Sequence, residues 1–214
     1  TSDGAAPVYL FNPADHSITN LRGGLITRPI LSQLRKLGDG RLYGTTTQGY
    51  YRLEADGSGA TWHSLESTGV TNFNRGVIEA NDGWIYLLAQ SGGPQNGGGV
   101  VRCRPDGRDA SLWHPFGWNV AGESSALTLA RDGRLYGYFQ REGRQAHYRI
   151  SPDGTIESFA NTGGWWNCED WGRSCYSSGP PASMRGGWTE GADGRLYGIT
   201  GDSRYNNSIP GIIT

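Results

Sequence analysis

Short runs of alternating apolar and polar residues follow one another along most of the chain. Clear examples lie at residues 127–130, 134–139, 147–150 and 155–159. Alternation with a period of two is typical of strands that bury one face, whereas amphipathic helices repeat every 3.6 residues. The pattern therefore predicts an all-β chain.

The strands recur in register with two repeated phrases. The first phrase, Asp-Gly-x-Leu/Ile-Tyr, begins at Asp39, Asp82, Asp132 and Asp193. The second, an apolar run that ends in Asp-Gly, occupies residues 51–57, 101–107 and 148–154. Asp-Gly between apolar runs marks a tight hairpin turn, because glycine accepts a positive φ. One unit therefore corresponds to about four antiparallel strands in about 45 residues, which is the period of a β-propeller blade.

The repeats predict a small β-propeller of four blades in a single domain, residues 1–214. The blades are expected at residues 31–68, 77–117 and 125–161, with a fourth at 187–214 that is completed by N-terminal strands at 7–21. Such closure removes exposed strand edges. Residues 211–213 and 8–10 nevertheless compete for one position in the unit. A segment of a longer propeller and an open edge that pairs with another copy therefore stay open as alternatives. A β-sandwich is a further alternative, although a sandwich does not repeat one Asp-Gly phrase in register.

The repeat resembles one that is found in known proteins. Asp39-Gly-Arg-Leu-Tyr-Gly-Thr-Thr46 is similar to the tandem repeat of the choice-of-anchor proteins of Gloeobacter and Verrucomicrobia, which are secreted bacterial proteins. The second unit departs from that pattern at Trp84 and Leu87, and residues 161–186 have no counterpart in it. The resemblance implies an extracellular, propeller-like protein, and it implies no catalytic residues.

Composition narrows the function classes. The chain has 35 glycines, 8 tryptophans and 11 tyrosines, with 18% charged residues and a net charge of −1. This charge excludes a general nucleic-acid clamp, which needs a basic excess. No apolar run approaches the ~18 residues of a membrane-spanning helix. The many aromatic residues argue against disorder, since they supply surface to bury.

The three cysteines indicate an oxidising compartment. Cys168 and Cys175 lie close together in a stretch rich in glycine and tryptophan, where a disulfide would close a short loop. Cys103 takes the repeat position of Leu53 and Ile150, so we expect a small buried hydrophobe there. Together with the N-terminal Thr1-Ser-Asp-Gly, which is compatible with removal of a signal peptide, the cysteines favour a secreted, extracellular or periplasmic location.

The stretch that interrupts the repeat, residues 162–186, is the best candidate for a binding site, because specificity is commonly added on loops of a repeated scaffold. Flat aromatic rings next to polar side chains suit a sugar, which offers a C–H face and hydroxyl edges. The predicted ligand-binding residues are Trp165, Trp166, Asn167, Glu169, Asp170, Trp171, Arg173 and Tyr176. The alternative is structural, with these rings closing the opening of the propeller.

Catalytic and metal chemistry is less well supported. Glu169 and Asp170 are adjacent on one chain, whereas a glycosidase needs two carboxyls that face each other. The repeated aspartates lack the several nearby oxygen ligands of a calcium-binding loop. We expect each of them to form hydrogen bonds within its own turn. We therefore predict no catalytic residue, metal or cofactor, and a glycan or another extracellular protein as partner. A polysaccharide lyase or hydrolase and a self-assembling structural subunit remain alternatives.

Overall fold

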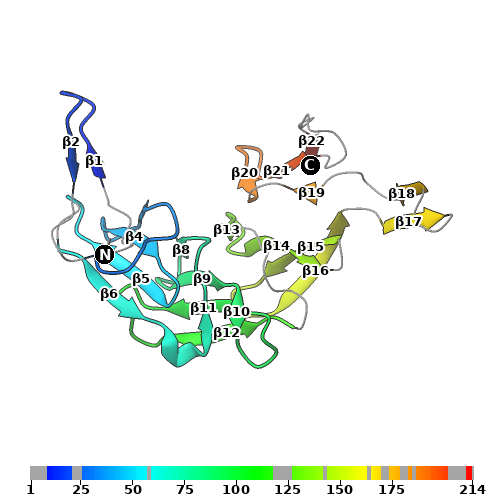
Figure 1. Cartoon of the computed structure of the whole chain (residues 1–214), viewed down its shortest axis with the longest axis horizontal. Coiled ribbons are helices and arrows are strands. Elements are labelled where there is room, and N and C mark those ends of the chain that lie inside the picture. Colours follow the sequence, from blue (N-terminus) through cyan, green and yellow to red (C-terminus); the bar gives the residue numbers. More distant parts are fainter. Residues whose placement is uncertain are drawn as a thin grey trace. The chain divides into compact units, whose positions relative to one another are not determined.

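A computed structural model describes residues 9–20, 26–56, 59–117, 127–141, 144–162, 165–169, 174–178, 183–184, 187–201 and 211–213. The chain divides into two compact units, Thr1–Phe116 and Gly117–Thr214, and each is described by itself. Within the described residues, the regular elements are strands and one short 3₁₀ helix, η1 (Glu66–Thr68) (Figure 1). No helix in this part of the chain is long and apolar enough to cross a membrane.

The first unit contains two antiparallel four-stranded sheets. The first sheet has the order β3 (Arg35–Lys36), β4 (Leu42–Thr45), β5 (Gly49–Leu53), β6 (Thr61–Ser64). The second has the order β8 (Val77–Glu79), β9 (Ile85–Ala89), β11 (Gly99–Cys103), β12 (Ser111–Pro115). Two smaller sheets pair β1 (Tyr9–Phe11) with β2 (Ile18–Asn20) and β7 (Val70–Thr71) with β10 (Ser91–Gly92).

The second unit also contains two four-stranded sheets. The first has the order β13 (Thr128–Leu129), β14 (Leu135–Arg141), β15 (Arg144–Ile150), β16 (Ile156–Thr162). In the second, β21 (Leu196–Gly201) pairs with β19 (Ser183–Met184), β20 (Thr189–Glu190) and β22 (Gly211–Ile213). A separate hairpin joins β17 (Trp165–Glu169) and β18 (Ser174–Ser178). The four larger sheets coincide with the sequence repeat, while their union in a single domain stays a prediction.

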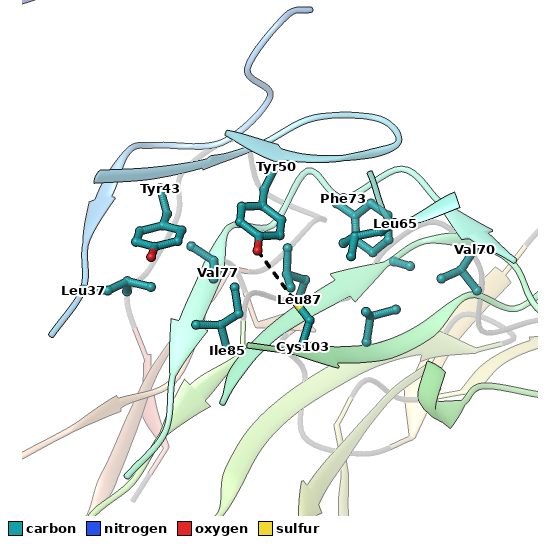
Figure 2. Close-up of a cluster of buried hydrophobic side chains, with 12 residues drawn as sticks. Leu37, Tyr43, Tyr50, Leu65, Val70, Phe73, Val77, Ile85, Leu87 and Cys103 are labelled. Carbon is teal, nitrogen blue, oxygen red and sulfur yellow. Dashed lines mark hydrogen bonds between the residues drawn. The ribbon is translucent and has the colours of Figure 1, made fainter. Parts of the chain in front are cut away.

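The core of the first unit lies where the faces of its two large sheets meet (Figure 2). Tyr43 and Tyr50 from the first sheet are fully buried, as are Leu87 and Cys103 from the second. The hydroxyl of Tyr50 lies 3.9 Å from the sulfur of Cys103. Each sheet thus covers the apolar face of its neighbour, as successive blades of a propeller do.

The second unit repeats this packing. Tyr136 and Tyr138 of β14 pack with Trp188 and Leu196, which belong to the following sheet or directly precede it. The hydroxyl of Thr128 donates a hydrogen bond to the carbonyl of Trp188 at 2.6 Å. The same strand position therefore supplies the contact between successive sheets in both units.

The strand pairing at the two ends of the chain can be given only within each unit. In the first unit β1 pairs with β2, and in the second β22 pairs with β21, where Ile212 lies opposite Ile199. That residues 7–21 complete the last blade stays a prediction.

Candidate functional site

The predicted ligand-binding stretch forms a two-stranded hairpin. In the register of β17 and β18, Trp165 lies opposite Ser178, Trp166 opposite Ser177, Asn167 opposite Tyr176, and Glu169 opposite Ser174. The structure therefore brings five of the eight predicted residues together on one element. The other three, Asp170, Trp171 and Arg173, lie outside the described residues.

The register assigns these positions to the two faces of the hairpin. Positions that alternate along a strand share a face. Trp165, Asn167 and Tyr176 therefore occupy positions of one face, and Trp166 occupies a position of the other. Both faces of this two-stranded sheet therefore carry aromatic residues, and the blade repeat predicts none of the three.

The predicted disulfide partners also meet on this hairpin. Cys168 lies directly opposite Cys175 in the register. Directly opposite residues of antiparallel strands have Cα atoms about 4.5–5.5 Å apart, which lies within the range that a disulfide spans. The backbone thus supports the disulfide, which stays a prediction.

Cys103 has the structural role that its repeat position predicts. It is fully buried in the core between the first two sheets and has a free thiol. Burial raises the pKa of this thiol to about 12. A thiol that stays protonated is a poor nucleophile and metal ligand, so Cys103 packs as a small apolar residue.

Each repeated aspartate holds its own turn together. Its Oδ1 accepts a hydrogen bond from the backbone N–H two residues later, at 3.0–3.1 Å. Its Oδ2 accepts one from the tyrosine hydroxyl four residues later, at 2.7–2.9 Å. This Asp–Tyr clamp joins Asp39 to Tyr43, Asp82 to Tyr86, Asp132 to Tyr136 and Asp193 to Tyr197. Turn formation therefore accounts for both carboxylate oxygens.

The clamp shifts the acidity of both partners. Burial opposes ionisation of Asp39, but the hydrogen bonds from Arg41 and Tyr43 outweigh it, so the pKa of this carboxyl is lowered. Burial, aided by the hydrogen bond to Asp82, raises the pKa of Tyr86 to about 12. The clamp thus joins a carboxylate to a neutral phenol at ordinary pH. The hydrogen bond is charge-assisted for this reason.

All four histidines pack against aromatic rings. The ring centroids of His16 and Phe11 are 6.4 Å apart, those of His63 and Tyr50 5.0 Å, and those of His114 and Phe116 5.9 Å. His147 lies between Tyr138 and Trp188, at 5.8 and 5.2 Å. Burial lowers the pKa of His147 to about 4 and also lowers those of His63 and His114. These environments favour a structural role for the imidazoles.

The arginines that follow the Asp-Gly turns form ion pairs with carboxylates of their own blades. Nε of Arg41 lies 3.1 Å from Glu54, and a terminal nitrogen of Arg134 lies 3.0 Å from Asp132. Arg195 lies 3.9 Å from Asp193. These pairs are largely exposed, so each contributes at most about 1 kcal/mol. Within the described residues, no group of three or more His, Cys, Asp or Glu side chains could hold a metal ion.

Sequence reasoning missed an amide cluster between the first two sheets. Oε1 of Gln90 accepts hydrogen bonds from the side-chain amides of Asn72 at 2.9 Å and Asn74 at 3.0 Å. Gln90 is buried, and Asn72 has a positive φ of 67°. The cluster ties the connection before β8 to the end of β9. The only sequence signal is an Asn-x-Asn before one strand and a Gln after the next, which has no specific meaning in isolation.

Comparisons with known proteins show similarity to solved structures and to no known sequence family. No family model and no curated protein matches the chain. Among solved structures, the selenomethionine-substituted virginiamycin B lyase from Staphylococcus aureus matches with a TM-score of 0.60 and 18% identity, over 100% of this chain. A catalytically inactive form of that lyase with quinupristin matches with a TM-score of 0.57, 16% identity and 99% coverage of this chain. The chain spans 64% of the length of each lyase structure.

A protein described as a putative gluconolactonase matches with a TM-score of 0.52 and 16% identity, over 100% of this chain and 76% of its own. These neighbours are β-propellers. Together with the repeated four-stranded sheets, they confirm that the chain has an all-β propeller fold. At this level of identity the likeness extends to the fold alone.

Proposed function

We propose that this chain is a secreted recognition module that binds a carbohydrate through the hairpin of β17 and β18 and the residues that connect them. The propeller supplies the scaffold, and the hairpin supplies the ligand-binding residues. Flat aromatic rings contact the C–H face of a sugar, while Asn167, Glu169, Asp170 and Arg173 offer hydrogen bonds to its hydroxyl groups.

The observation that carries this proposal is the separation of the hairpin from the blades. β17 and β18 pair with each other in a sheet of their own, whereas the large sheets follow the repeat. The blade repeat explains the tyrosines of the Asp–Tyr clamp and leaves Trp165, Trp166 and Tyr176 unexplained. A two-stranded hairpin is at best marginally stable in water. The disulfide between Cys168 and Cys175 would stabilise it.

The location of the protein is part of the same proposal. A disulfide in a short loop forms in oxidising compartments. The resemblance of the Asp-Gly-x-Leu-Tyr repeat to that of secreted bacterial proteins points the same way. We therefore propose an extracellular or periplasmic site of action, where glycans and other extracellular proteins are the available partners.

A lyase or hydrolase of polysaccharides on the same scaffold is the weaker alternative. General acid–base catalysis needs a titratable group within reach of substrate and with a pKa near the working pH. The four histidines instead pack against aromatic rings. For His147 burial lowers the pKa to about 4. These environments favour binding over catalysis.

A glycan array tests the proposal. The native chain is compared with a variant in which a Gly-Ser linker replaces residues 165–178, so that the blades are retained. We expect binding to a related group of glycans by the native chain and loss of that binding in the variant. Equal binding by both chains, or none by the native chain, would overturn a carbohydrate-binding role for the hairpin.

A further inference from the structure

Two arginines and two tryptophans of the first unit contact one another on the second sheet. The guanidinium carbon of Arg104 lies 4.1 Å from the ring centroid of Trp84, and that of Arg102 lies 4.7 Å from the same centroid. Arg102 also lies 5.6 Å from the ring centroid of Trp113. Each distance is within the ~6 Å over which a cation is attracted to the face of an aromatic ring. We call these four residues the Arg–Trp cluster.

The cluster replaces an ion pair of the blade repeat. The first sheet has Arg41 directly after its Asp-Gly turn and Glu54 directly after β5, and Nε of Arg41 lies 3.1 Å from Oε1 of Glu54. In the register of the second sheet, Trp84 takes the position of Arg41, and Arg104 takes that of Glu54. A positive charge therefore occupies the position of a negative one, and it contacts a neutral ring in place of an ion.

The carboxylates near the cluster leave most of its positive charge unbalanced. The carboxylate of Asp82 accepts hydrogen bonds from its own turn and from the clamp tyrosine. The carboxylate of Asp109 lies 4.0 Å from Nε of Arg104, and the side chain of Asp109 is 67% exposed. Within the part of the chain that the structure describes, Arg102 forms no ion pair. Two guanidinium groups thus share one ring with one distant counter-charge.

Arg104 is held in place while part of its guanidinium group stays unused. Its Nη1 donates hydrogen bonds to the carbonyls of Asp82 and Gly83, at 3.4 Å each. An arginine has five N–H donors, and the side chain of Arg104 is 39% exposed. A fixed planar guanidinium with further donors is suited to bind a carboxylate or another oxyanion through two parallel hydrogen bonds.

This end of a blade stays at the surface when another sheet packs on the same face. The second sheet covers the corresponding face of the first, through the core that includes Tyr43 and Tyr50. The side chains of Arg41 and Glu54 are nevertheless 37% and 49% exposed. Arg104 takes the position of Glu54 and has a similar exposure. A sheet that packs on the second sheet in the same way therefore leaves Arg104 accessible to a ligand.

We propose that the Arg–Trp cluster binds an acidic polysaccharide, with a carboxylate or sulfate group at the guanidinium groups and the C–H face of the sugar next to the tryptophan rings. An anion beside Arg102 and Arg104 offsets the repulsion between two like charges. Nucleic acids are less suitable ligands, since their affinity draws on many phosphate contacts and the chain has a net charge of −1. The cluster is separate from the β17–β18 hairpin, so this proposal does not rest on the hairpin.

Calorimetric titration with polymers of different charge tests the ligand class. The native chain is titrated at low salt with dextran sulfate, polygalacturonate, neutral dextran and inorganic sulfate. We expect binding of an acidic polymer, no binding of dextran and weaker binding of inorganic sulfate. The chain whose residues 165–178 are replaced by a linker should retain this binding. Failure of both acidic polymers, inorganic sulfate that binds as tightly as the polymer, or a single-stranded oligonucleotide that binds more tightly would overturn the proposal.

Substitutions of two neighbouring arginines test the site itself. Arg104→Gln should weaken binding of the acidic polymer roughly tenfold, because it removes a charge-assisted pair. Arg108→Gln is the matched control, since Arg108 is 80% exposed in the same turn and pairs with Asp106. Arg104→Lys keeps the charge without the planar fork and should bind with intermediate affinity. Circular dichroism verifies that each variant is folded. Unchanged affinity in Arg104→Gln, or equal losses in Arg104→Gln and Arg108→Gln, would overturn the proposal.

Discussion

At the scale of single residues, the Asp–Tyr clamp explains why the Asp-Gly phrase recurs. The carboxylate holds the turn through the backbone N–H of residue i+2 and the strand through the tyrosine at i+4. The sequence predicts the turn, because Asp-Gly has a known preference for it. It does not predict the hydroxyl contact, which depends on how the strand twists after the turn.

Removing one clamp hydroxyl should destabilise the fold measurably. Tyr43 is fully buried, so Tyr43→Phe loses a charge-assisted hydrogen bond without replacement by water. We expect the free energy of unfolding, measured by urea denaturation, to fall by about 1.5–3 kcal/mol. Tyr197→Phe is the matched control, since its bond to Asp193 is exposed and water can replace it. Equal losses in both variants would contradict the larger contribution of the buried clamp, and no loss in Tyr43→Phe would contradict a stabilising role for it.

His147 should make the stability depend on pH. Its pKa is about 4 in the folded chain, against an ordinary value of 6.5 when unfolded. The unfolded chain therefore binds more protons between these values, and stability falls as the pH is lowered through this window. The loss attributable to His147 is on the order of 3 kcal/mol, and stability from this group is constant above pH ~7.

The check is urea denaturation of the native chain and of His147→Phe at pH values from 4 to 7. The variant keeps an aromatic ring beside Tyr138 and Trp188 and lacks the titrating group. Its stability should fall less on acidification, with a residual slope from His63 and His114, whose pKa values burial also lowers. Identical pH profiles would show that protonation of His147 does not limit stability.

At the scale of elements, the sequence predicts the blades well because each blade is a local unit. Strands β14 to β16 follow one another through short turns, so alternation and turn residues are sufficient to locate them. The pairing of β22 with β21 is different, because residues 211–213 and 8–10 are both short apolar segments that fit this position in the repeat. The local residue pattern does not show which of the two pairs with β21. The β17–β18 hairpin differs from the blades in its residue types, and its strands carry no repeat signal.

Two turn glycines offer a test of close packing between blades. Gly107 lies in the turn between β11 and β12, and Gly40 lies in the turn between β3 and β4. Gly107 has a φ of 85°, and a Cβ there would lie 2.6 Å from Nδ1 of His63. Gly40 has a similar φ of 81° with no atom within 4 Å of a Cβ. Gly40→Ala should cost about 1 kcal/mol for the left-handed backbone. Gly107→Ala should cost about 1–2 kcal/mol more, because His63 must move.

Urea denaturation of the two variants measures this difference. Both carry the same backbone strain, so the excess at Gly107 reports the contact with His63. Similar destabilisation of the two variants would mean that the turn and the imidazole are not in close contact.

The hairpin of β17 and β18 should contain one disulfide. Thiol titration of the denatured, unreduced chain should give one reactive thiol, that of Cys103, instead of three. Cys168→Ser should expose the thiol of Cys175 and restore a second reactive group. Three thiols in the native protein, purified from an oxidising compartment, would contradict the disulfide and weaken the case for secretion.

At the scale of the whole molecule, the chain is a propeller, and the proposed function rests on residues 162–186, which interrupt its sequence repeat. The fold could be read from the repeat because propeller blades have one sequence phrase for one structural unit. The candidate site could be proposed from the break in the repeat, but its geometry could not be predicted, since the positions of Trp166 and Tyr176 depend on how β17 pairs with β18 and not on the repeat.

Isothermal titration of Trp166→Ala with a glycan that binds the native chain tests the central claim most directly. Trp166 belongs to the hairpin outside the repeat, whereas Trp84 lies under Arg104 on the second sheet, with the guanidinium carbon 4.1 Å from the ring centroid. Trp84→Phe is therefore the matched control. The account predicts that Trp166→Ala weakens binding at least about tenfold and that Trp84→Phe binds like the native chain. Unchanged affinity in Trp166→Ala, or equal loss in both variants, would contradict it.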